Sequence, residues 1–228
     1  TSLTAEVIKI ANEKQFLSPR QTSVLSIRDA INVIGLKRLK NLVISVGFQL
    51  QNNNLAVEEV SDFNVNVARV ASELTFYTEG VSEDEAYLAG LFHNAGTLLF
   101  ATKYPDYDQV FLESLQYAYR GTQLENSNYG TTHTVAGILV AKKWQLDNLF
   151  NQVILMHHQR NLSKIGNSKA RTLISIVQLA IALVTQSLFS NYSGEEVDQM
   201  LANSCAELMI EETLLADIRD ELLKYSIS

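Results

Sequence analysis

The 228-residue sequence has few residues that break helices or cross-link a chain. It contains two prolines, ten glycines and a single cysteine, Cys205. One cysteine excludes an intramolecular disulfide and suits a reducing compartment. The scarcity of proline and glycine, together with 46% hydrophobic residues recurring at helical spacing, predicts an all-α protein, a compact multi-helix bundle with short loops.

The sequence also lacks an export signal. No basic segment followed by an apolar stretch stands at Thr1, so we expect a cytoplasmic protein. Residues 172–194 carry no charged side chain and are long enough to span a bilayer. Polar side chains recur along this segment, and aromatic residues do not flank it on both sides. These features favour a central helix buried on most sides, with no membrane contact.

Positive charge is scarce outside the first fifty residues. Those residues carry seven Lys/Arg against three Asp/Glu, and the remainder carries eleven against twenty-two, which gives a net charge of −7. An acidic chain is disfavoured as a non-specific binder of nucleic acid or anionic membranes. The basic edge formed by Lys37, Arg38 and Lys40 is a candidate docking surface for a partner. Residues 193–228 hold nine acids on an apolar helical pattern, which predicts a helical cap on the bundle.

Residues 26–50 predict two helices that are joined at Gly35. Because Lys37, Arg38 and Lys40 open the second helix, this segment resembles a helix-turn-helix, and a nucleic-acid-binding regulator is one alternative. Two packed helices around a glycine turn are far commoner than DNA-binding motifs. The residues that follow also lack a base-reading set of Arg, Asn and Gln.

The stretch Ser82 to Lys103 predicts a capped helix that carries a buried polar pair. Ser82 and Glu85 form the S-x-x-E pattern of a capping box, so a helix should begin there. Almost uninterrupted apolar residues then place His93 and Asn94 inside the core. A polar pair at that depth must be hydrogen-bonded, must ligate something or must cost stability.

Four histidines stand at or near the ends of apolar helices, an arrangement that points to a shared site. They are His93, His133, His157 and His158. Imidazoles suit transition metals, whereas a dinuclear hydrolytic centre usually adds a bridging carboxylate. Asn94 follows His93 and offers only a neutral amide. The chemistry therefore favours a hydrogen-bonded polar cluster without a cofactor, with a transition metal at the four histidines and Asn94 as the alternative.

Several segments together resemble the HDOD family, a relative of the HD-type metal-dependent phosphohydrolases. The segment YLAGLFHNAGTLLFATKYPDYDQV is similar to the family's hallmark, and TAEVIKIAN, SIRDAINVIGLKRLKNLVIS, THTVAGILVAKKWQL and ILMHHQ are similar to other family segments in the same order. The resemblance implies an HDOD-like helical domain over residues 1–187, normally preceded by further helices, and a C-terminal helical extension over 188–228 packed on the same domain. It also replaces the helix-turn-helix interpretation of Gly35.

The resemblance further implies a degraded metal site. His93, His133, His157 and His158 match family histidines, and Asn94 stands where the aspartate of the His-Asp pair belongs. The family's early histidine corresponds to Val65, and its closing aspartate falls near Ile181. Phosphoester hydrolysis of this type needs metal-bound hydroxide, which the lost carboxylates would help to hold. We therefore expect a vestigial site without phosphohydrolase activity.

For function, the resemblance implies a non-catalytic bacterial signal-transduction module that acts through protein–protein contacts. Its partner would be a signalling protein such as a response regulator or a cyclic-dinucleotide enzyme, and a homodimer is left open. Two alternatives remain: a metal-dependent phosphohydrolase with a site made of histidines alone, and a nucleic-acid-binding regulator, which the acidic charge makes the weakest.

Overall fold

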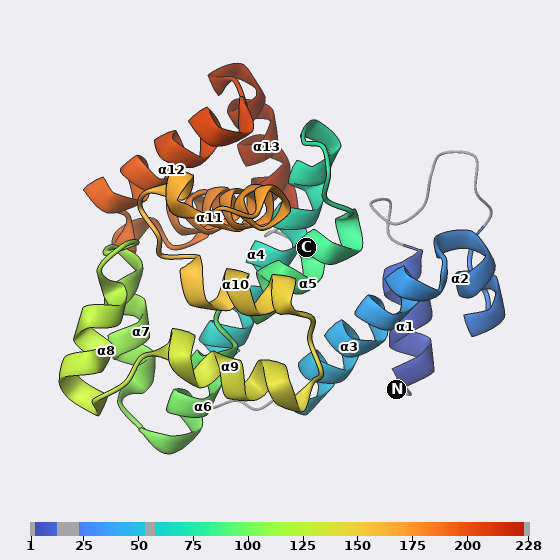
Figure 1. Cartoon of the computed structure of the whole chain (residues 1–228), viewed down its shortest axis with the longest axis horizontal. Coiled ribbons are helices and arrows are strands. Elements are labelled where there is room, and N and C mark those ends of the chain that lie inside the picture. The colour runs from blue at the N-terminus through green and yellow to red at the C-terminus, as the bar shows by residue number, and fades with distance from the viewer. Residues whose placement is uncertain (1–2, 13–22, 53–57, 226–228) are drawn as a thin grey trace.

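The computed structural model describes residues 3–12, 23–52 and 58–225, and within these ranges the chain forms helices and no strand. The all-α prediction is confirmed. The α-helices are α1 (Leu3–Ala11), α2 (Ile27–Ile34), α3 (Leu36–Asn52), α4 (Glu58–Leu74), α5 (Glu83–Phe92), α6 (Ala95–Lys103), α7 (Tyr107–Leu115), α8 (Gly121–Tyr129), α9 (His133–Lys143), α10 (Asn148–Met156), α11 (Ser168–Leu188), α12 (Glu195–Leu208) and α13 (Glu212–Tyr225). Three short 3₁₀ turns are η2 (Thr75–Tyr77), η3 (Leu162–Lys164) and η4 (Ser190–Tyr192). Figure 1 shows α11 between α12 on one side and α10 on the other, with α1, α2 and α3 set apart from it.

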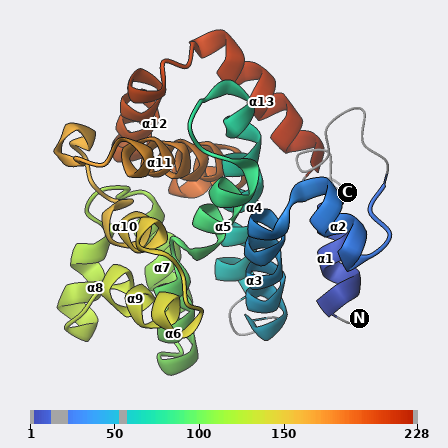
Figure 2. The same cartoon turned by 45° about the vertical axis from the view of Figure 1, so that its right-hand side comes forward.

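Helices α1, α2 and α3 form one side of the molecule, and α3 joins them to the rest by packing on α5 (Figure 2). Ser26 caps α2 by accepting a hydrogen bond from the backbone N–H of Asp29. Gly35 ends α2 with a φ of 83°, a left-handed conformation that a side chain would strain. The predicted helix pair joined at Gly35 is therefore present.

Residues 172–188 of the uncharged segment lie in α11, whose residues 173–185 are all buried among α4, α5, α10 and α12. By length and composition this helix is apolar enough to cross a membrane, yet 72% of its most apolar window is buried inside the protein. Such burial on most sides is what the sequence predicted for a central core helix.

The segment that follows Ser82 forms two helices, α5 and α6, where the sequence predicted one. The capping box of Ser82 and Glu85 begins α5 as predicted. The chain then turns at His93 and Asn94, and α6 begins at Ala95. On α5, Gly90 allows a close crossing with α4, because a Cβ atom there would lie 2.6 Å from the Cα of Ala68. The turn places both polar side chains in the core.

Two short helices follow α6. Helix α7 begins at Tyr107 and ends at Leu115, and α8 starts at Gly121. Thr132 then caps α9 by accepting a hydrogen bond from the N–H of Val135. Gly96 of α6 packs directly against the backbone of His133 at the start of α9. A Cβ atom added at Gly96 would overlap the carbonyl oxygen of His133. This contact places His133.

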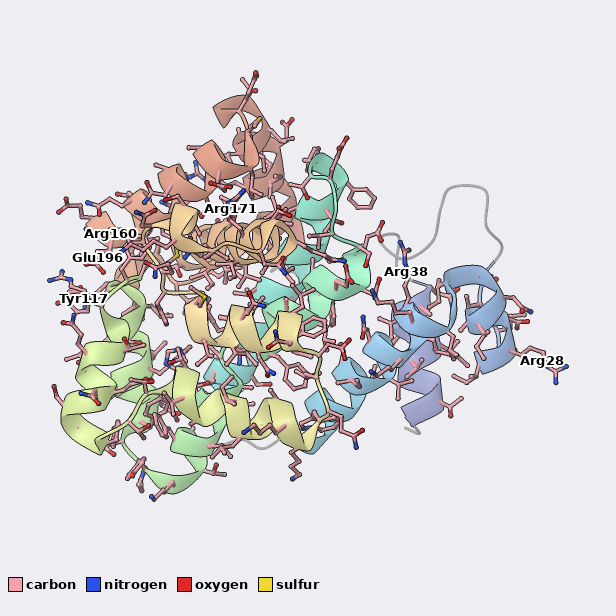
Figure 3. All side chains as sticks on the ribbon, viewed as in Figure 1. Arg28, Arg38, Tyr117, Arg160, Arg171 and Glu196 are labelled. Atoms are coloured by element: carbon pink, nitrogen blue, oxygen red, sulfur yellow. The ribbon has the colours of Figure 1, made fainter. Side chains whose placement is uncertain are left out.

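The C-terminal helices α12 and α13 pack against α11, and α12 also reaches the α7–α8 turn. The buried carboxylate of Glu196 accepts hydrogen bonds from the backbone N–H groups of Tyr119 and Arg120 at 3.0 and 3.2 Å. It also pairs with the Arg120 side chain. Figure 3 shows Glu196 beside Arg160 at this edge of the molecule.

Candidate functional site

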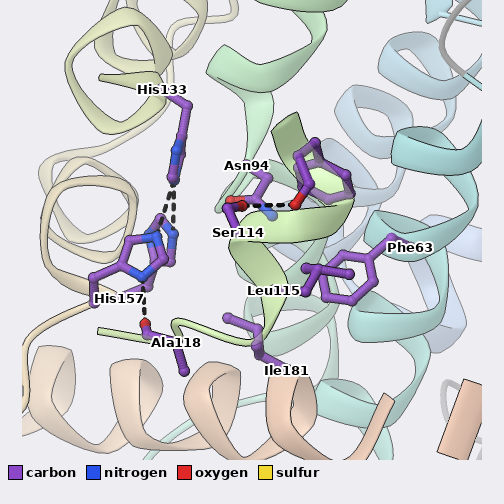
Figure 4. Close-up of a pocket in the computed structure, with 10 residues that line it drawn as sticks. Phe63, Asn94, Ser114, Leu115, Ala118, His133, His157 and Ile181 are labelled. Carbon is purple, nitrogen blue, oxygen red and sulfur yellow. Dashed lines mark hydrogen bonds between the residues drawn. The ribbon is translucent and has the colours of Figure 1, made fainter. Parts of the chain in front are cut away.

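The ends of α5, α9 and α10 bring the four histidines together in the core. The Nε2 atom of His133 lies 3.1 Å from Nε2 of His157 and 3.1 Å from Nε2 of His158. The ring centroid of His93 lies 5.1 Å from that of His157. Figure 4 shows the His133 ring pointing toward His157. The shared site that the sequence pointed to is therefore a cluster of histidine rings in the fold.

Each histidine uses its Nδ1 atom for a hydrogen bond to an oxygen. His93 contacts the carbonyl of Gly90 at 2.5 Å, His157 that of Ile154 at 3.0 Å and His158 that of Ala118 at 2.6 Å. A carbonyl oxygen can only accept, so Nδ1 must carry the hydrogen in these rings. In a neutral imidazole the lone pair then lies on Nε2. The Nε2 lone pairs of His157 and His158 therefore face His133.

Burial keeps most of these rings neutral. It lowers the pKa of His93 to about 3 and that of His158 to about 4, and it lowers the pKa of His157 well below its ordinary value. Neutral imidazoles are the form that binds metals. The Nε2 atom of His93 is buried without a hydrogen-bond partner among the described residues.

A carboxylate that the sequence analysis missed completes the cluster. Glu125, on α8, is 1% exposed and accepts from the backbone N–H of His133 at 2.7 Å. One of its oxygens lies 2.8 Å from His133 Nδ1, and its other oxygen accepts from the Tyr107 hydroxyl. Burial alone would raise the pKa of Glu125, but His133 and the donated hydrogen bonds lower it overall. In the sequence, the contact between Glu125 and His133 is hinted at by their short separation of eight residues.

A small cavity lies beside the histidines. Its volume is about 20 Å³, room for roughly one water molecule. Asn94 and Ile181 both line it, as does Phe63 from α4 (Figure 4). Val65, where the resemblance placed the lost early histidine, is not a lining residue, and Phe63 stands two positions before it. The remaining lining residues are Phe111, Ser114, Leu115, Ala118, His133, His157 and His158.

The residues present fit one transition-metal ion. One nitrogen from each of His133, His157 and His158 lies within 4.8 Å of the other two. Three imidazole ligands around a zinc ion, at about 2.0–2.1 Å, would lie about 3.3 Å apart at tetrahedral corners, near the 3.1 Å separations here. Within the described ranges this group contains no carboxylate, and Glu125 faces the far nitrogen of His133. A bridged pair of ions is therefore not supported.

The basic edge is largely engaged within the chain. Lys37 Nζ lies 2.7 Å from Glu85, and Arg38 contacts Glu83 at 3.0 Å and Asp84 at 3.3 Å. Figure 3 shows Arg38 at the junction of α3 and α5. Lys40 is exposed. Much of the positive charge predicted to form a docking surface is thus neutralised by carboxylates of α5.

Comparisons with known proteins agree with this architecture. The model of the HDOD domain matches residues 1–160. An uncharacterized protein from Treponema pallidum (strain Nichols) is 25% identical over 168 residues, which cover 69% of this chain and 31% of that protein. The chain thus spans about a third of the length of this relative.

Solved structures share the fold at low identity. A protein from Shewanella amazonensis SB2B, provisionally named a metal-dependent phosphohydrolase, matches with a TM-score of 0.65 and 21% identity over 97% of this chain and 79% of that one. A protein from Marinobacter aquaeolei VT8, provisionally named a signal transduction protein, matches with a TM-score of 0.65 and 21% identity over 97% of this chain and 49% of that one. At these identities the likeness concerns the fold.

Proposed function

The chain belongs to the HDOD family, and from this premise we propose that it is a non-catalytic regulatory domain of bacterial signal transduction in the cytoplasm. It would act by contacts with another signalling protein, such as a response regulator or a cyclic-dinucleotide enzyme. The name of the Marinobacter relative supports a signalling role, and the name of the Shewanella relative supports descent from HD-type phosphohydrolases.

The small size and the lining of the cavity beside the histidines are the observation on which the non-catalytic part of this proposal rests. Phe63 and Ile181 line it with apolar side chains, and Asn94 supplies an amide where the resemblance expects a carboxylate. The remaining volume of about 20 Å³ holds a water molecule, and a phosphodiester group with its substituents is larger. Without bridging carboxylates, neither a pair of ions nor the attacking hydroxide is held in place.

A hydrolysis assay tests the non-catalytic part. Purified protein would be incubated with Mn²⁺, Fe²⁺ or Zn²⁺ and with cyclic dinucleotides, nucleotides and a generic phosphodiester. We expect no turnover above that of the His93→Ala variant. Turnover that His93→Ala abolishes would show an active hydrolase and reject the proposal.

The regulatory part predicts that partner binding does not depend on the buried histidines. Affinity capture from the native bacterium would identify a partner, and its affinity for the wild type and for His133→Ala would then be measured with purified components. We expect equal affinities within about twofold. No saturable binding of any captured signalling protein would count against an adaptor role.

A second candidate function is the binding of one transition-metal ion, and the convergence of three imidazoles favours it. His133, His157 and His158 would hold the ion, and such an ion can polarise a bound water molecule, which keeps the phosphohydrolase alternative open. Metal content of purified protein is the test. We expect up to one Zn²⁺ per chain in the wild type and loss of it in His133→Ala. Equal metal content in both would reject this site.

A further inference from the structure

We propose that Glu125 is the positioning carboxylate of the histidine site: it holds His133 in the tautomer whose lone pair faces the ion, and it supplies negative charge that Asn94 cannot. This inference rests on the second candidate function, the one-ion site of His133, His157 and His158. Nothing in the sequence pattern or the family's hallmark segment assigns Glu125 a role.

His133 is the centre of the cluster, so its tautomer decides whether three lone pairs can converge. Its Nε2 atom is 3.1 Å from Nε2 of both His157 and His158, whereas those two rings are fixed independently by backbone carbonyls. Glu125 is the group that holds His133 Nδ1, at 2.8 and 2.9 Å from its two oxygens. An ionised carboxylate only accepts, so the Nδ1 hydrogen is fixed there, and in the neutral ring, the form that binds a metal, Nε2 keeps its lone pair.

Glu125 is itself held rigidly. Its carboxylate is 1% exposed and receives the backbone N–H of His133 at 2.7 Å and the hydroxyl of Tyr107. These donors satisfy the oxygen atoms without another cation, so the negative charge of Glu125 is directed at the His133 ring. The side chain thus has the placement of a carboxylate that orients a metal-binding histidine.

The charge of Glu125 also matters for an ion in this core. Three neutral imidazoles leave the full charge of a divalent ion uncompensated in a buried cavity, which is unfavourable. Asn94 and Ile181 line the cavity and add no charge. Glu125, one imidazole ring away, offsets part of the ion's charge. Loss of such an outer carboxylate typically lowers metal affinity 10- to 100-fold.

The first test compares Zn²⁺ affinity among variants by competition with a chromogenic chelator. Glu125→Gln keeps the size of the side chain but lacks the charge and can turn its amide donor toward His133 Nδ1. We expect its affinity to fall about 10- to 100-fold. The matched control is Glu113→Gln on α7, because Glu113 is exposed and its side chain bonds with Gln109 at the surface. The control should bind Zn²⁺ like the wild type.

The second test reads the tautomer directly in metal-free protein. Long-range ¹H–¹⁵N NMR spectra of the histidine rings should show a hydrogen on Nδ1 of His133 in the wild type and a changed tautomer in Glu125→Gln, with His157 and His158 unchanged. A merely structural role for Glu125 would not change this signature. The absorption spectrum of the Co²⁺-loaded protein should change in Glu125→Gln as well.

The possible results distinguish a failure of the role proposed for Glu125 from a failure of the one-ion site on which that role depends. A wild type that binds Zn²⁺ and a folded Glu125→Gln variant that binds it equally well, or a wild-type His133 with its hydrogen on Nε2, would overturn the role of Glu125. A wild type that binds no Zn²⁺ would instead overturn the one-ion site itself. Circular dichroism establishes that each variant is folded.

Discussion

Asn94 is the residue at which this chain departs from the hallmark pair of its family, and it lines the histidine cavity with 6% of its surface exposed. Asn94→Asp would place a carboxylate there. Without metal we expect a loss of about 1–3 kcal/mol in the free energy of unfolding, because a buried charge lacks a partner. With Zn²⁺ the variant should gain more thermal stability than the wild type does. An equal Zn²⁺-induced shift in Tm in both proteins would show that Asn94 lies outside the ion's reach.

Glu85 is a buried carboxylate with two ammonium partners. It contacts Lys37 and Lys169 at 2.7 Å each, and it accepts from the backbone N–H of Ser82. Burial opposes its charge, but these partners outweigh burial and lower its pKa to about 2. A depressed pKa stabilises the fold above the unfolded value of about 4.5, and this stabilisation is lost as the pH falls from about 4.5 to about 2.

Glu85→Gln should therefore cost about 2–3 kcal/mol in the free energy of unfolding at pH 7. The difference from the wild type should shrink at pH 3. Urea denaturation at the two pH values measures it, with Glu113→Gln as an exposed control. A difference that is the same at both pH values would contradict the assigned ion pairs.

At the scale of elements, the crossing of α6 and α9 decides where His133 stands. Gly96 lies against the His133 backbone, so Gly96→Ala forces the two helices apart. We expect a loss of about 2–3 kcal/mol in the free energy of unfolding, typical of overpacking, and weaker Zn²⁺ binding. Gly166→Ala is the matched control, because a Cβ there meets no atom within 4 Å. Similar Zn²⁺ affinities of the two variants would argue against this dependence.

Helix α12 supports the turn that holds His158. Glu196 accepts the N–H groups of Tyr119 and Arg120, and the carbonyl of the preceding Ala118 accepts from His158 Nδ1. Glu196→Gln should speed hydrogen exchange at Tyr119 and Arg120 and cost about 1–2 kcal/mol, because it weakens charge-assisted bonds. Its neighbour Glu195, whose side chain bonds to Gln199, provides the control Glu195→Gln. Unchanged hydrogen-exchange rates at Tyr119 and Arg120 in Glu196→Gln would show that α12 does not stabilise the turn that holds His158.

The sequence predicted those helix boundaries that carry a local signal. Ser82 with Glu85 marks a helix start through a capping box, Gly35 marks a helix end through a left-handed turn, and both stand where expected. The breaks at His93 and after Leu115 carry no proline or glycine at the turn. Tertiary packing sets them: α6 turns away to cross α9, and Glu196 from α12 holds residues 119 and 120.

At the scale of the whole molecule, the order of segments predicted the family and brought the right histidines into consideration. It could not identify Glu125 or Phe63, because their roles come from contacts between helices: Glu125 of α8 meets α9, and Phe63 of α4 lines the cavity. The sequence therefore indicated a site without a nearby carboxylate, whereas the fold supplies one beside His133.

Anomalous diffraction from crystals grown with Zn²⁺ tests the account of the histidine cluster most directly, which is that these residues form no dinuclear hydrolytic centre and, under the second candidate function, hold one ion. The account predicts one zinc peak, about 2.0–2.1 Å from Nε2 of His133, His157 and His158. Two peaks about 3.5–4 Å apart, as in two-metal hydrolases, or no peak at these histidines would contradict it.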